Sequence, residues 1–378
     1  MCLNLAKCKK EDPVFSDVEL LRYGRHIALP EFGIKGQEKL KKSSVLVVGA
    51  GGLGCPLLLY LAAAGVGAIG IIDDDVVDLS NLQRQVLFTV DDLGQPKATC
   101  AAKRLFQINP EIKITPIIKR LDANNALEIL ARYDVVADGT DNFPSRYLIN
   151  DACVLLQKTN VHASIFRFEG QVAVFNHLHA DGSRGPNYRD VFPAPPPEGL
   201  VPDCATAGVL GVLPGIIGSI QASEVIKVLS GIGESLAGRL LIFDALHMET
   251  RSMKIRKNPA LAPITELIDY EFFCHSQDAS KIEGDAANPH IISPQVLHLL
   301  IGNISKSIQL IDVRESHEYA QGNLGGMSIP LYQLVDNIHK IPRDIPVVCI
   351  CRSGMRSQKA MELLKKKGFM NVKICGED

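Results

Sequence analysis

The segment Val45-Leu-Val-Val-Gly49-Ala-Gly51-Gly52-Leu-Gly54 places an apolar run directly before a glycine-rich turn. The run is typical of a buried parallel strand, and the apolar residues 55–64 predict a buried helix after the turn. In this G-x-G-x-x-G pattern the glycines let backbone N–H groups approach a phosphate at the N-terminus of the helix. The segment therefore predicts the first strand–turn–helix unit of a nucleotide-binding sheet.

The flanking sequence continues the alternation of strands and helices, from a helix capped by Ser16 to a strand that ends at Asp73. Alternation of this kind favours a parallel sheet covered on both faces, so we expect a Rossmann-like doubly wound α/β sheet. We expect this first domain to span residues 16–256, followed by a linker at 257–290. A second, small α/β domain is expected at 291–378.

Composition excludes several classes of protein. A net charge of −2 does not indicate a nucleic-acid partner. The uncharged stretch 45–72 is long enough to cross a bilayer. It contains seven glycines and Pro56, however, and its pattern changes midway from strand to helix, so we do not expect a membrane span. The first residues lack the apolar core of a secretory signal, so we expect a cytoplasmic protein whose ten cysteines are reduced.

Basic residues after the second strand decide between two kinds of nucleotide. On the glycine pattern alone, an NAD-dependent oxidoreductase is the simplest interpretation, with Asp73 on the ribose. Asn81, Arg84 and Lys97 follow that strand, and Arg25 lies upstream. A triphosphate carries more charge than a dinucleotide pyrophosphate, and basic side chains stabilise the charge on its leaving group. These residues therefore favour ATP.

An acidic residue follows the strand expected at 134–138, in Gly139-Thr-Asp141-Asn142. Ligands of open α/β sheets lie beyond the carboxyl ends of the strands, so Asp141 is placed to hold Mg²⁺ against the phosphates. The alternative for Asp141 is a helix cap, because a helix is expected to follow.

Together these motifs resemble the MoeB/ThiF family, relatives of the ubiquitin-activating enzymes. The resemblance spans about residues 20–256 and rests on Arg22-Tyr-x-Arg25-His26, the glycine turn, Ser80-Asn81-Leu82-Gln83-Arg84, Gly94-Gln-Pro-Lys97, Gly139-Thr-Asp-Asn142 and Val201-Pro-Asp-Cys204 before Ala207-Gly-Val-Leu-Gly-Val-Leu-Pro-Gly215. It implies a homodimer in which Arg25 reaches into the partner's ATP site. It also implies that residues 80–84, Lys97, Asp141 and Asn142 bind ATP.

The resemblance implies adenylation of the C-terminal glycine of a small ubiquitin-like sulfur carrier that ends in Gly-Gly, of the MoaD/ThiS type. The site must hold the carboxylate in line with the α-phosphate and neutralise the departing pyrophosphate. No protein nucleophile is needed for that step. Cys204 matches a cysteine that relatives use for a covalent link to the carrier, although a buried hydrophobic role is the alternative.

Many MoeB-like proteins hold a structural zinc with two C-x-x-C pairs. Here Asn187 and Asp190 stand where the first pair would fall, and the region 259–263 contains no cysteine. Cys274 stands alone, whereas a closed zinc site needs four ligands. We therefore expect no zinc, and we expect apolar packing to hold the loops that it would join.

The second domain carries the loop Cys351-Arg352-Ser353-Gly354-Met355-Arg356 between an apolar strand and a helix. Backbone N–H groups and the helix dipole in such a loop favour a thiolate or persulfide on Cys351. The loop resembles the active loop of rhodanese sulfurtransferases, and Ile311-Asp-Val-Arg314-Glu315 with Glu318-Tyr319 matches their earlier segment. A phosphatase loop would need C-x5-R, one residue more than this chain has.

Rhodanese domains usually continue past the last strand with a final helix, whereas this sequence stops at Asp378. We therefore expect a truncated domain. A two-step enzyme is predicted, in which a persulfide sulfur donor loads Cys351 and the adenylated carrier becomes a thiocarboxylate. An adenylyltransferase with an inactive rhodanese-like binding domain is one alternative, and a non-catalytic scaffold for ubiquitin-like proteins is another. Molybdenum cofactor biosynthesis and tRNA 2-thiolation would share this chemistry.

Overall fold

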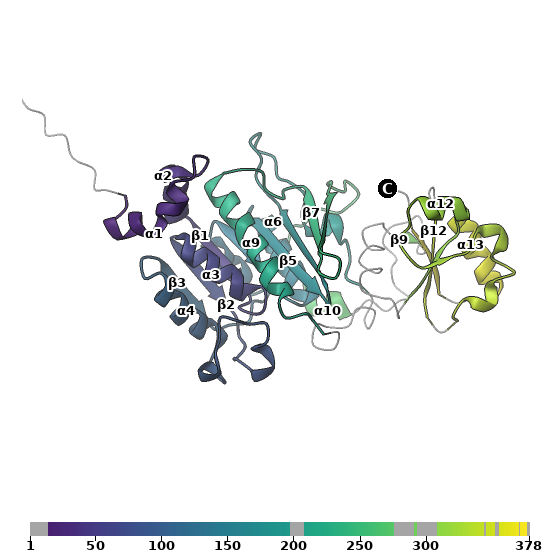
Figure 1. Cartoon of the computed structure of the whole chain (residues 1–378), viewed down its shortest axis with the longest axis horizontal. Helices are drawn as coiled ribbons and strands as arrows, with labels where there is room; N and C mark the ends of the chain where they lie inside the picture. The colour runs from purple at the N-terminus through teal and green to yellow at the C-terminus, as the bar shows by residue number, and fades with distance from the viewer. Residues whose placement is uncertain are drawn as a thin grey trace, which may run out of the picture.

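The computed structural model describes residues 14–196, 208–275, 291–292, 308–343, 345–351, 355–369 and 371–375. Within these residues the chain forms one α/β domain around an eight-stranded sheet and a second around a five-stranded sheet (Figure 1). The predicted fold class, a Rossmann-like domain followed by a small α/β domain, is confirmed.

Parallel strands form the first part of the large sheet, in the order β3-β2-β1-β4-β5. Val45 and Val47 of β1 pack in one hydrophobic core, and Leu46 and Val48 pack in the other. Because both faces of β1 are buried, its sequence is apolar without alternation. The strands are β1 (Ser44–Val48), β2 (Ala68–Ile72), β3 (Lys113–Ile117), β4 (Val135–Asp138) and β5 (Thr159–Phe166).

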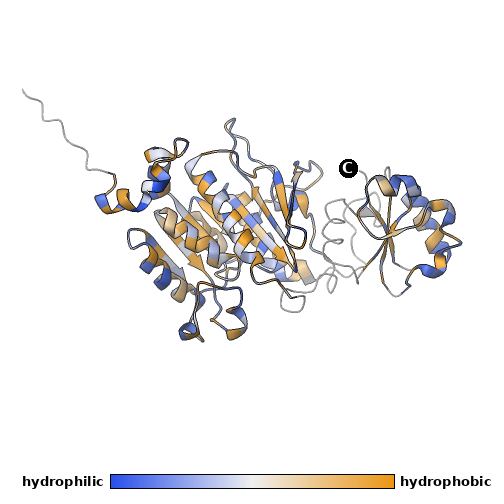
Figure 2. Cartoon of the chain, in the orientation of Figure 1, coloured by the Kyte–Doolittle hydropathy of each residue, from blue (hydrophilic) through white to orange (hydrophobic). Residues whose placement is uncertain are grey.

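Helices cover both faces of this sheet. One face carries α3 (Gly54–Ala64), α4 (Lys97–Ile108) and α9 (Leu213–Ser230). The other carries α5 (Ala126–Ala131), α6 (Phe143–Leu155) and α10 (Tyr270–His275). Figure 2 shows that hydrophobic residues concentrate in the strands and in α3 and α9. None of the described helices is long and apolar enough to cross a membrane, and the uncharged stretch 45–72 divides into β1, the glycine turn, α3 and β2.

Two helices precede β1. Helix α1 (Asp17–Ile27) begins with a capping box, in which Ser16 Oγ accepts from Glu19 N and Glu19 Oε2 accepts from Ser16 N. This confirms the cap expected from the sequence. The remaining short elements of the first domain are α2 (Gly33–Lys42), α7 (Tyr188–Val191) and the 3₁₀ turns η1 (Leu79–Asn81) and η2 (Val90–Asp92).

The other half of the sheet is antiparallel, which the sequence did not predict. Strands β6 (Glu169–Phe175), β7 (Arg239–Asp244) and β8 (Glu249–Lys254) continue from β5 by antiparallel pairing. We also did not predict β5, because buried Asn160 and His162 interrupt its apolar pattern. A two-residue connection joins β5 to β6 at Arg167, where φ is +52°, and so short a connection requires antiparallel strands.

Part of the range expected to be a linker packs on the first domain. Tyr270 of α10 is buried, and its hydroxyl donates to Asp151 Oδ2 on α6 at 2.8 Å. Asn258 N donates to Asp190 Oδ1 at 2.7 Å. The boundary at residue 256 stays a prediction, and this packing favours a later one.

The second domain is built on a parallel sheet in the order β11-β10-β12-β13-β9. Ala360 and Leu364 of its helix α13 pack with buried Cys349, which was expected in the core. The strands are β9 (Ile291–Ile292), β10 (Gln309–Asp312), β11 (Met327–Ser328), β12 (Val347–Ile350) and β13 (Val372–Cys375). The helices and turns are α12 (Ser316–Gln321), α13 (Met355–Lys366), η3 (Leu331–Gln333) and η4 (Ile338–Lys340).

Candidate active site

A crevice lies at the carboxyl ends of β1, β2 and β4, beside the glycine turn. This is the edge where open α/β sheets bind their ligands. The structure brings together there eight of the residues selected from the sequence: Gly49, Gly51, Gly52, Asp73, Arg84, Lys97, Asp141 and Asn142.

The glycine turn is shaped by close backbone approaches. Gly49 has a φ of +90°, and a Cβ at Gly54 would lie 2.0 Å from the carbonyl oxygen of Gly49. Gly54 is therefore required for the entry into α3, and it is buried rather than lining the crevice. Asp73 Oδ2 accepts from Ala50 N at 2.7 Å, and burial raises the pKa of Asp73. Asp73 thus fastens the turn to the end of β2.

Two of the predicted basic residues line the crevice with the turn. Lys97, the first residue of α4, is buried, and its Nζ lies 2.8 Å from Asp75 Oδ2. Arg84 Nη1 donates to the carbonyl oxygen of Ser80 at 3.2 Å. A Cβ at Gly52 would lie 3.6 Å from Arg84 Cδ, which places the Arg84 side chain over the turn.

The buried carboxylate of Asp138 holds the loop after β4 through hydrogen bonds. Asp138 Oδ1 accepts from Thr140 N at 3.0 Å and from Thr140 Oγ1 at 2.7 Å. Asp138 Oδ2 lies 2.9 Å from Nδ1 of His162, which is also buried. Burial opposes ionisation of Asp138, but hydrogen bonds from His162 and Thr140 outweigh it and lower its pKa. Burial also lowers the pKa of His162, so we assign a neutral imidazole beside an ionised carboxylate.

Asp141 is an exposed residue of this loop at the edge of the crevice. It is not the cap of the following helix, which was the alternative role considered from the sequence. The N-cap of α6 is Asn142, whose Oδ1 accepts from Ser145 N at 2.9 Å. The cap therefore leaves the Asp141 carboxylate at the crevice. Among the described residues no group of three or more His, Cys, Asp or Glu side chains could hold a metal ion. Mg²⁺ commonly takes only one or two carboxylates together with substrate phosphates, so Asp141 with a nucleotide fits that ion.

Several predicted residues lie outside the crevice lining. Ser80, Asn81, Leu82 and Gln83 belong to η1 and the turn after it, where Asp78 Oδ1 accepts from Ser80 N. Arg25 is exposed on α1. Cys204 lies outside the described residues.

Other crevice residues were missed. Asp75, Gln85, Lys119, Arg120, Thr140 and Arg146 also line it. Lys119 and Arg120 closely follow the end of β3, so the rule that ligands gather beyond strand ends could have found them. Arg146 Nη2 donates to the carbonyl oxygen of Thr140 at 3.3 Å. No local pattern signals it, since the contact depends on the fold of the turn before α6.

The loops around Asn187 and residues 259–263, which we expected apolar packing to hold, are joined by polar contacts as well. Asn187 caps α7, and Asp190 Oδ2 accepts from Asn187 N at 2.7 Å. Through its other oxygen, Asp190 reaches the backbone of Asn258. Arg189 Nε and Nη2 donate to the two carboxylate oxygens of Asp151. The prediction that apolar packing holds these loops was therefore incomplete, because hydrogen bonds and an ion pair also hold them. The absence of zinc stays a prediction.

In the second domain Cys351 directly follows β12 and precedes α13. Ser357 N donates to Cys351 Sγ at 3.3 Å. Met355 is exposed, and Arg356 forms an ion pair with Glu318. Arg352, Ser353 and Gly354 lie outside the described residues.

Comparisons with known proteins match both domains. The ThiF family matches residues 23–263, and the rhodanese-like domain matches residues 293–375. A "Probable adenylyltransferase/sulfurtransferase MoeZ" of Mycobacterium tuberculosis is 47% identical over 94% of this chain and 90% of its own length. A "Sulfur carrier protein adenylyltransferase" of Thermus thermophilus is 54% identical over 68% of this chain and 97% of its own length. The "Adenylyltransferase and sulfurtransferase MOCS3-2" of Zea mays is 41% identical over 94% of this chain and 77% of its own length.

Solved structures share the fold at lower identity. E. coli MccB has a TM-score of 0.55 and 21% identity, covering 68% of this chain and 75% of that one. A structure of PaaA has a TM-score of 0.53 and 23% identity, covering 67% and 79%. These structures support the fold of the first domain.

Proposed function

Because this chain belongs to the ThiF family and carries a rhodanese-like domain, we propose that its crevice binds ATP and adenylates the C-terminal glycine of a ubiquitin-like sulfur carrier, and that Cys351 then supplies sulfur. The chain is an adenylyltransferase and a sulfurtransferase, as are its named relatives. The observation that carries the proposal is the convergence of Arg84, Lys97 and Asp141 beside Gly52 in one crevice. Family membership overturns the NAD-dependent oxidoreductase alternative.

Charge in the crevice suits a triphosphate. The described lining includes the basic residues Arg84, Lys97, Lys119, Arg120 and Arg146. Basic groups fixed in a crevice stabilise charge that develops on a departing pyrophosphate without having to reorganise during the reaction. We assign Arg84 and Lys97 to the phosphates, because both line the crevice together with the glycine turn, whose N–H groups suit a phosphate.

We assign Asp73 to the ribose and Asp141 to Mg²⁺. When bound, Mg²⁺ would neutralise charge on the phosphates, and Asp141 would hold it from the lip of the crevice. The remaining work of the chain is to orient two substrates. The carrier carboxylate must lie in line with the α-phosphate, which places both reactants in one geometry and removes much of the entropic barrier.

The adenylation step forms a bond between a carboxylate oxygen of the carrier and the α-phosphorus and breaks the bond to pyrophosphate. We propose that the terminal sulfur of a Cys351 persulfide then attacks the carrier carbonyl and releases AMP. The resulting acyl disulfide is cleaved by Cys204, which leaves a carrier thiocarboxylate and a Cys204–Cys351 disulfide. A cellular dithiol reduces that disulfide, and a persulfide donor reloads Cys351.

The proposal also covers the oligomeric state, the location in the cell and the pathway that the carrier serves. We propose a homodimer in which Arg25 of one copy reaches the ATP site of the other. We propose a cytoplasmic location, where thiols stay reduced. The carrier is proposed to end in Gly-Gly and to serve molybdenum cofactor biosynthesis, tRNA 2-thiolation or both.

Intact mass of a Gly-Gly carrier after incubation with the full chain and Mg-ATP tests the two steps. We expect a carrier–AMP species in the absence of a sulfur donor and a carrier thiocarboxylate once a persulfide donor and a dithiol are added. Cys351→Ala should form the adenylate but no thiocarboxylate. A carrier that lacks its last glycine is the matched control. If the intact carrier gains no AMP, the first step is wrong, and if Cys351→Ala still yields thiocarboxylate, the second step is wrong.

A further inference from the structure

The sulfur of Cys351 lies against the first turn of α13. Ser357 N donates to Cys351 Sγ at 3.3 Å, and Ser357 Oγ lies 3.3 Å from the same sulfur. Ser357 is wholly buried, so its position is set by packing. Hydrogen-bond donors aimed at a sulfur favour its thiolate form and steady a persulfide attached to it. The reactivity of Cys351 therefore depends on where the first turn of α13 lies.

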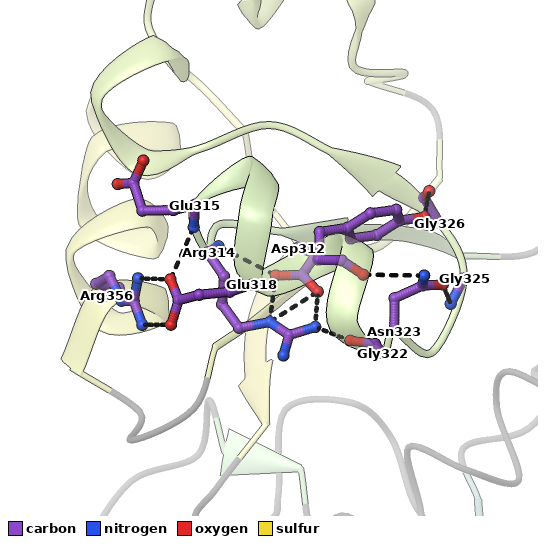
Figure 3. Close-up of polar contacts among 10 residues, drawn as sticks. Asp312, Arg314, Glu315, Glu318, Gly322, Asn323, Gly325, Gly326 and Arg356 are labelled. Atoms are coloured by element: carbon purple, nitrogen blue, oxygen red, sulfur yellow. Dashed lines mark hydrogen bonds and ion pairs between the residues drawn. The ribbon is translucent and has the colours of Figure 1, made fainter.

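Glu318 of α12 forms an ion pair with Arg356 in the first turn of α13. Arg356, next to Ser357 in the chain, donates through Nη1 to Glu318 Oε2 at 2.6 Å and through Nη2 to Glu318 Oε1 at 2.9 Å. Figure 3 shows the two groups facing each other with both bonds drawn. Glu318 Oε2 also accepts from Glu315 N at 2.9 Å, as part of the capping box of α12.

This geometry differs from that of an ordinary surface ion pair. Single exposed pairs contribute little to stability, but two parallel bonds between a guanidinium and a carboxylate also fix their relative orientation. The side chains of Arg356 and Glu318 are only 31% and 23% exposed. Because the carboxylate is itself held by the cap of α12, the pair ties the start of α13 to the start of α12.

We propose that Glu318 is a positioning residue for sulfur transfer. Acting through Arg356, it fixes the first turn of α13 and so keeps the N–H and hydroxyl groups of Ser357 against Cys351 Sγ. The inference rests on the proposed role of Cys351 as the sulfur-carrying residue.

A competing role for Arg356 makes the opposite prediction. If Arg356 served to attract an anionic sulfur donor, Glu318 would be a competitor for it, and loss of Glu318 would improve donor binding. If Glu318 positions the loop, its loss would slow sulfur transfer without improving donor binding. Arg314 does not change this comparison, because its guanidinium is bonded to both oxygens of buried Asp312 (Figure 3).

The test compares full-length wild type with Glu318→Gln and Arg356→Lys. Glu362→Gln is the matched control, since Glu362 is exposed on α13. Two assays are used: steady-state kinetics give kcat and KM for sulfur transfer from thiosulfate to cyanide, and iodoacetamide alkylation of Cys351 is followed as a function of pH. Mass spectrometry of the Cys351 peptide separates this cysteine from the other nine of the ten in the chain. Carrier adenylation reports on the first domain, and protection of buried Cys349 from alkylation reports that the second domain of each variant is folded.

We expect Glu318→Gln and Arg356→Lys to lower kcat at least about tenfold, as for a misplaced nucleophile, with KM for thiosulfate unchanged. The alkylation midpoint should move to higher pH in both variants. Wild-type kcat and alkylation in Glu318→Gln would overturn the proposal, as would a lower KM for thiosulfate. If wild type itself transfers no sulfur, the proposed sulfur-transfer role of Cys351 fails, whereas the alkylation profile still shows whether Glu318 positions the groups around Cys351.

Discussion

Lys97 Nζ lies 2.8 Å from Asp75 Oδ2, so the buried cation of the crevice is held by an acidic side chain that is 70% exposed. Both residues line the space assigned to the triphosphate. An ammonium this deeply buried needs a partner, since an unpaired buried charge is costly. Asp75 is therefore the partner of Lys97, and in the proposed complex phosphate oxygens would take its place.

The Lys97–Asp75 pair predicts opposite effects for its two partners. Lys97→Met should lower ATP–pyrophosphate exchange by about 100-fold or more, the scale seen when one stabilising donor is removed. Asp75→Asn should lower KM for ATP, because Lys97 then gains a partner only when the nucleotide binds. Steady-state exchange kinetics check both, and a raised KM in Asp75→Asn would show that the acid assists binding.

The two glycines Gly54 and Gly215 predict a contrast between required and replaceable positions. A Cβ at Gly54 would lie 2.0 Å from a backbone oxygen, whereas a Cβ at Gly215 meets no atom within 4 Å. We expect Gly54→Ala to cost about 1–3 kcal/mol in the free energy of unfolding and to weaken ATP binding. Gly215→Ala, inside α9, should be neutral or stabilising by up to about 1 kcal/mol. Urea unfolding and calorimetry measure these effects, and equal behaviour of the two variants would contradict the close approach.

The buried carboxylate of Asp138 predicts a large loss of stability on truncation. Asp138→Ala leaves the donors of Thr140 and His162 without an acceptor, at about 1–3 kcal/mol for each unsatisfied group. Asp138→Asn keeps an acceptor for Thr140 and should cost less. As a control, Asp122→Ala removes a similar acceptor from an exposed turn. Urea unfolding should rank Asp138→Ala as the least stable of the three, and similar losses for Asp138→Ala and Asp122→Ala would contradict the buried role.

The ion pair of Glu318 predicts a pH window. Hydrogen bonds from Arg356, and then from Glu315 N, hold the pKa of Glu318 at about 2, below its usual 4.5. Because the folded pKa is the lower one, the stabilising effect is complete above about pH 4.5 and is lost as the pH falls toward 2. The difference in unfolding temperature between wild type and Glu318→Gln should be constant from pH 7 to 5 and should shrink below that. A difference that grows on acidification would have the wrong sign.

Local patterns predicted β1 to β4, four of the five strands of the parallel half of the large sheet, because the signals lie within short segments. An apolar strand, a glycine turn and an apolar helix around Gly49 define one unit, and Asp73 and Asp141 each mark the end of a strand. The position of the crevice could be predicted because the carboxyl ends of parallel strands lie at the same edge of the sheet. Its other basic residues, Lys119 and Arg120, follow the same rule but lack a recognised motif.

Features that depend on contacts between distant segments could not be predicted in this way. Asn160 and His162 made β5 look polar, and the reason for His162 appears only when Asp138 lies beside it. Similarly, Tyr270 is buried because Asp151 accepts its hydroxyl, although the two are 119 residues apart. The contact between Asp190 and the backbone of Asn258 could not be predicted for the same reason, and it lies where we expected apolar packing.

ATP–pyrophosphate exchange in the presence of a Gly-Gly carrier, compared between wild type and Asp141→Ala, tests the central claim most directly. Asp141 is exposed at the crevice and is not the cap of α6, so its replacement should leave the fold intact. We predict carrier-dependent exchange in wild type and a loss of about 100-fold or more in the variant. Exchange that survives undiminished in Asp141→Ala would show that the chemistry takes place elsewhere.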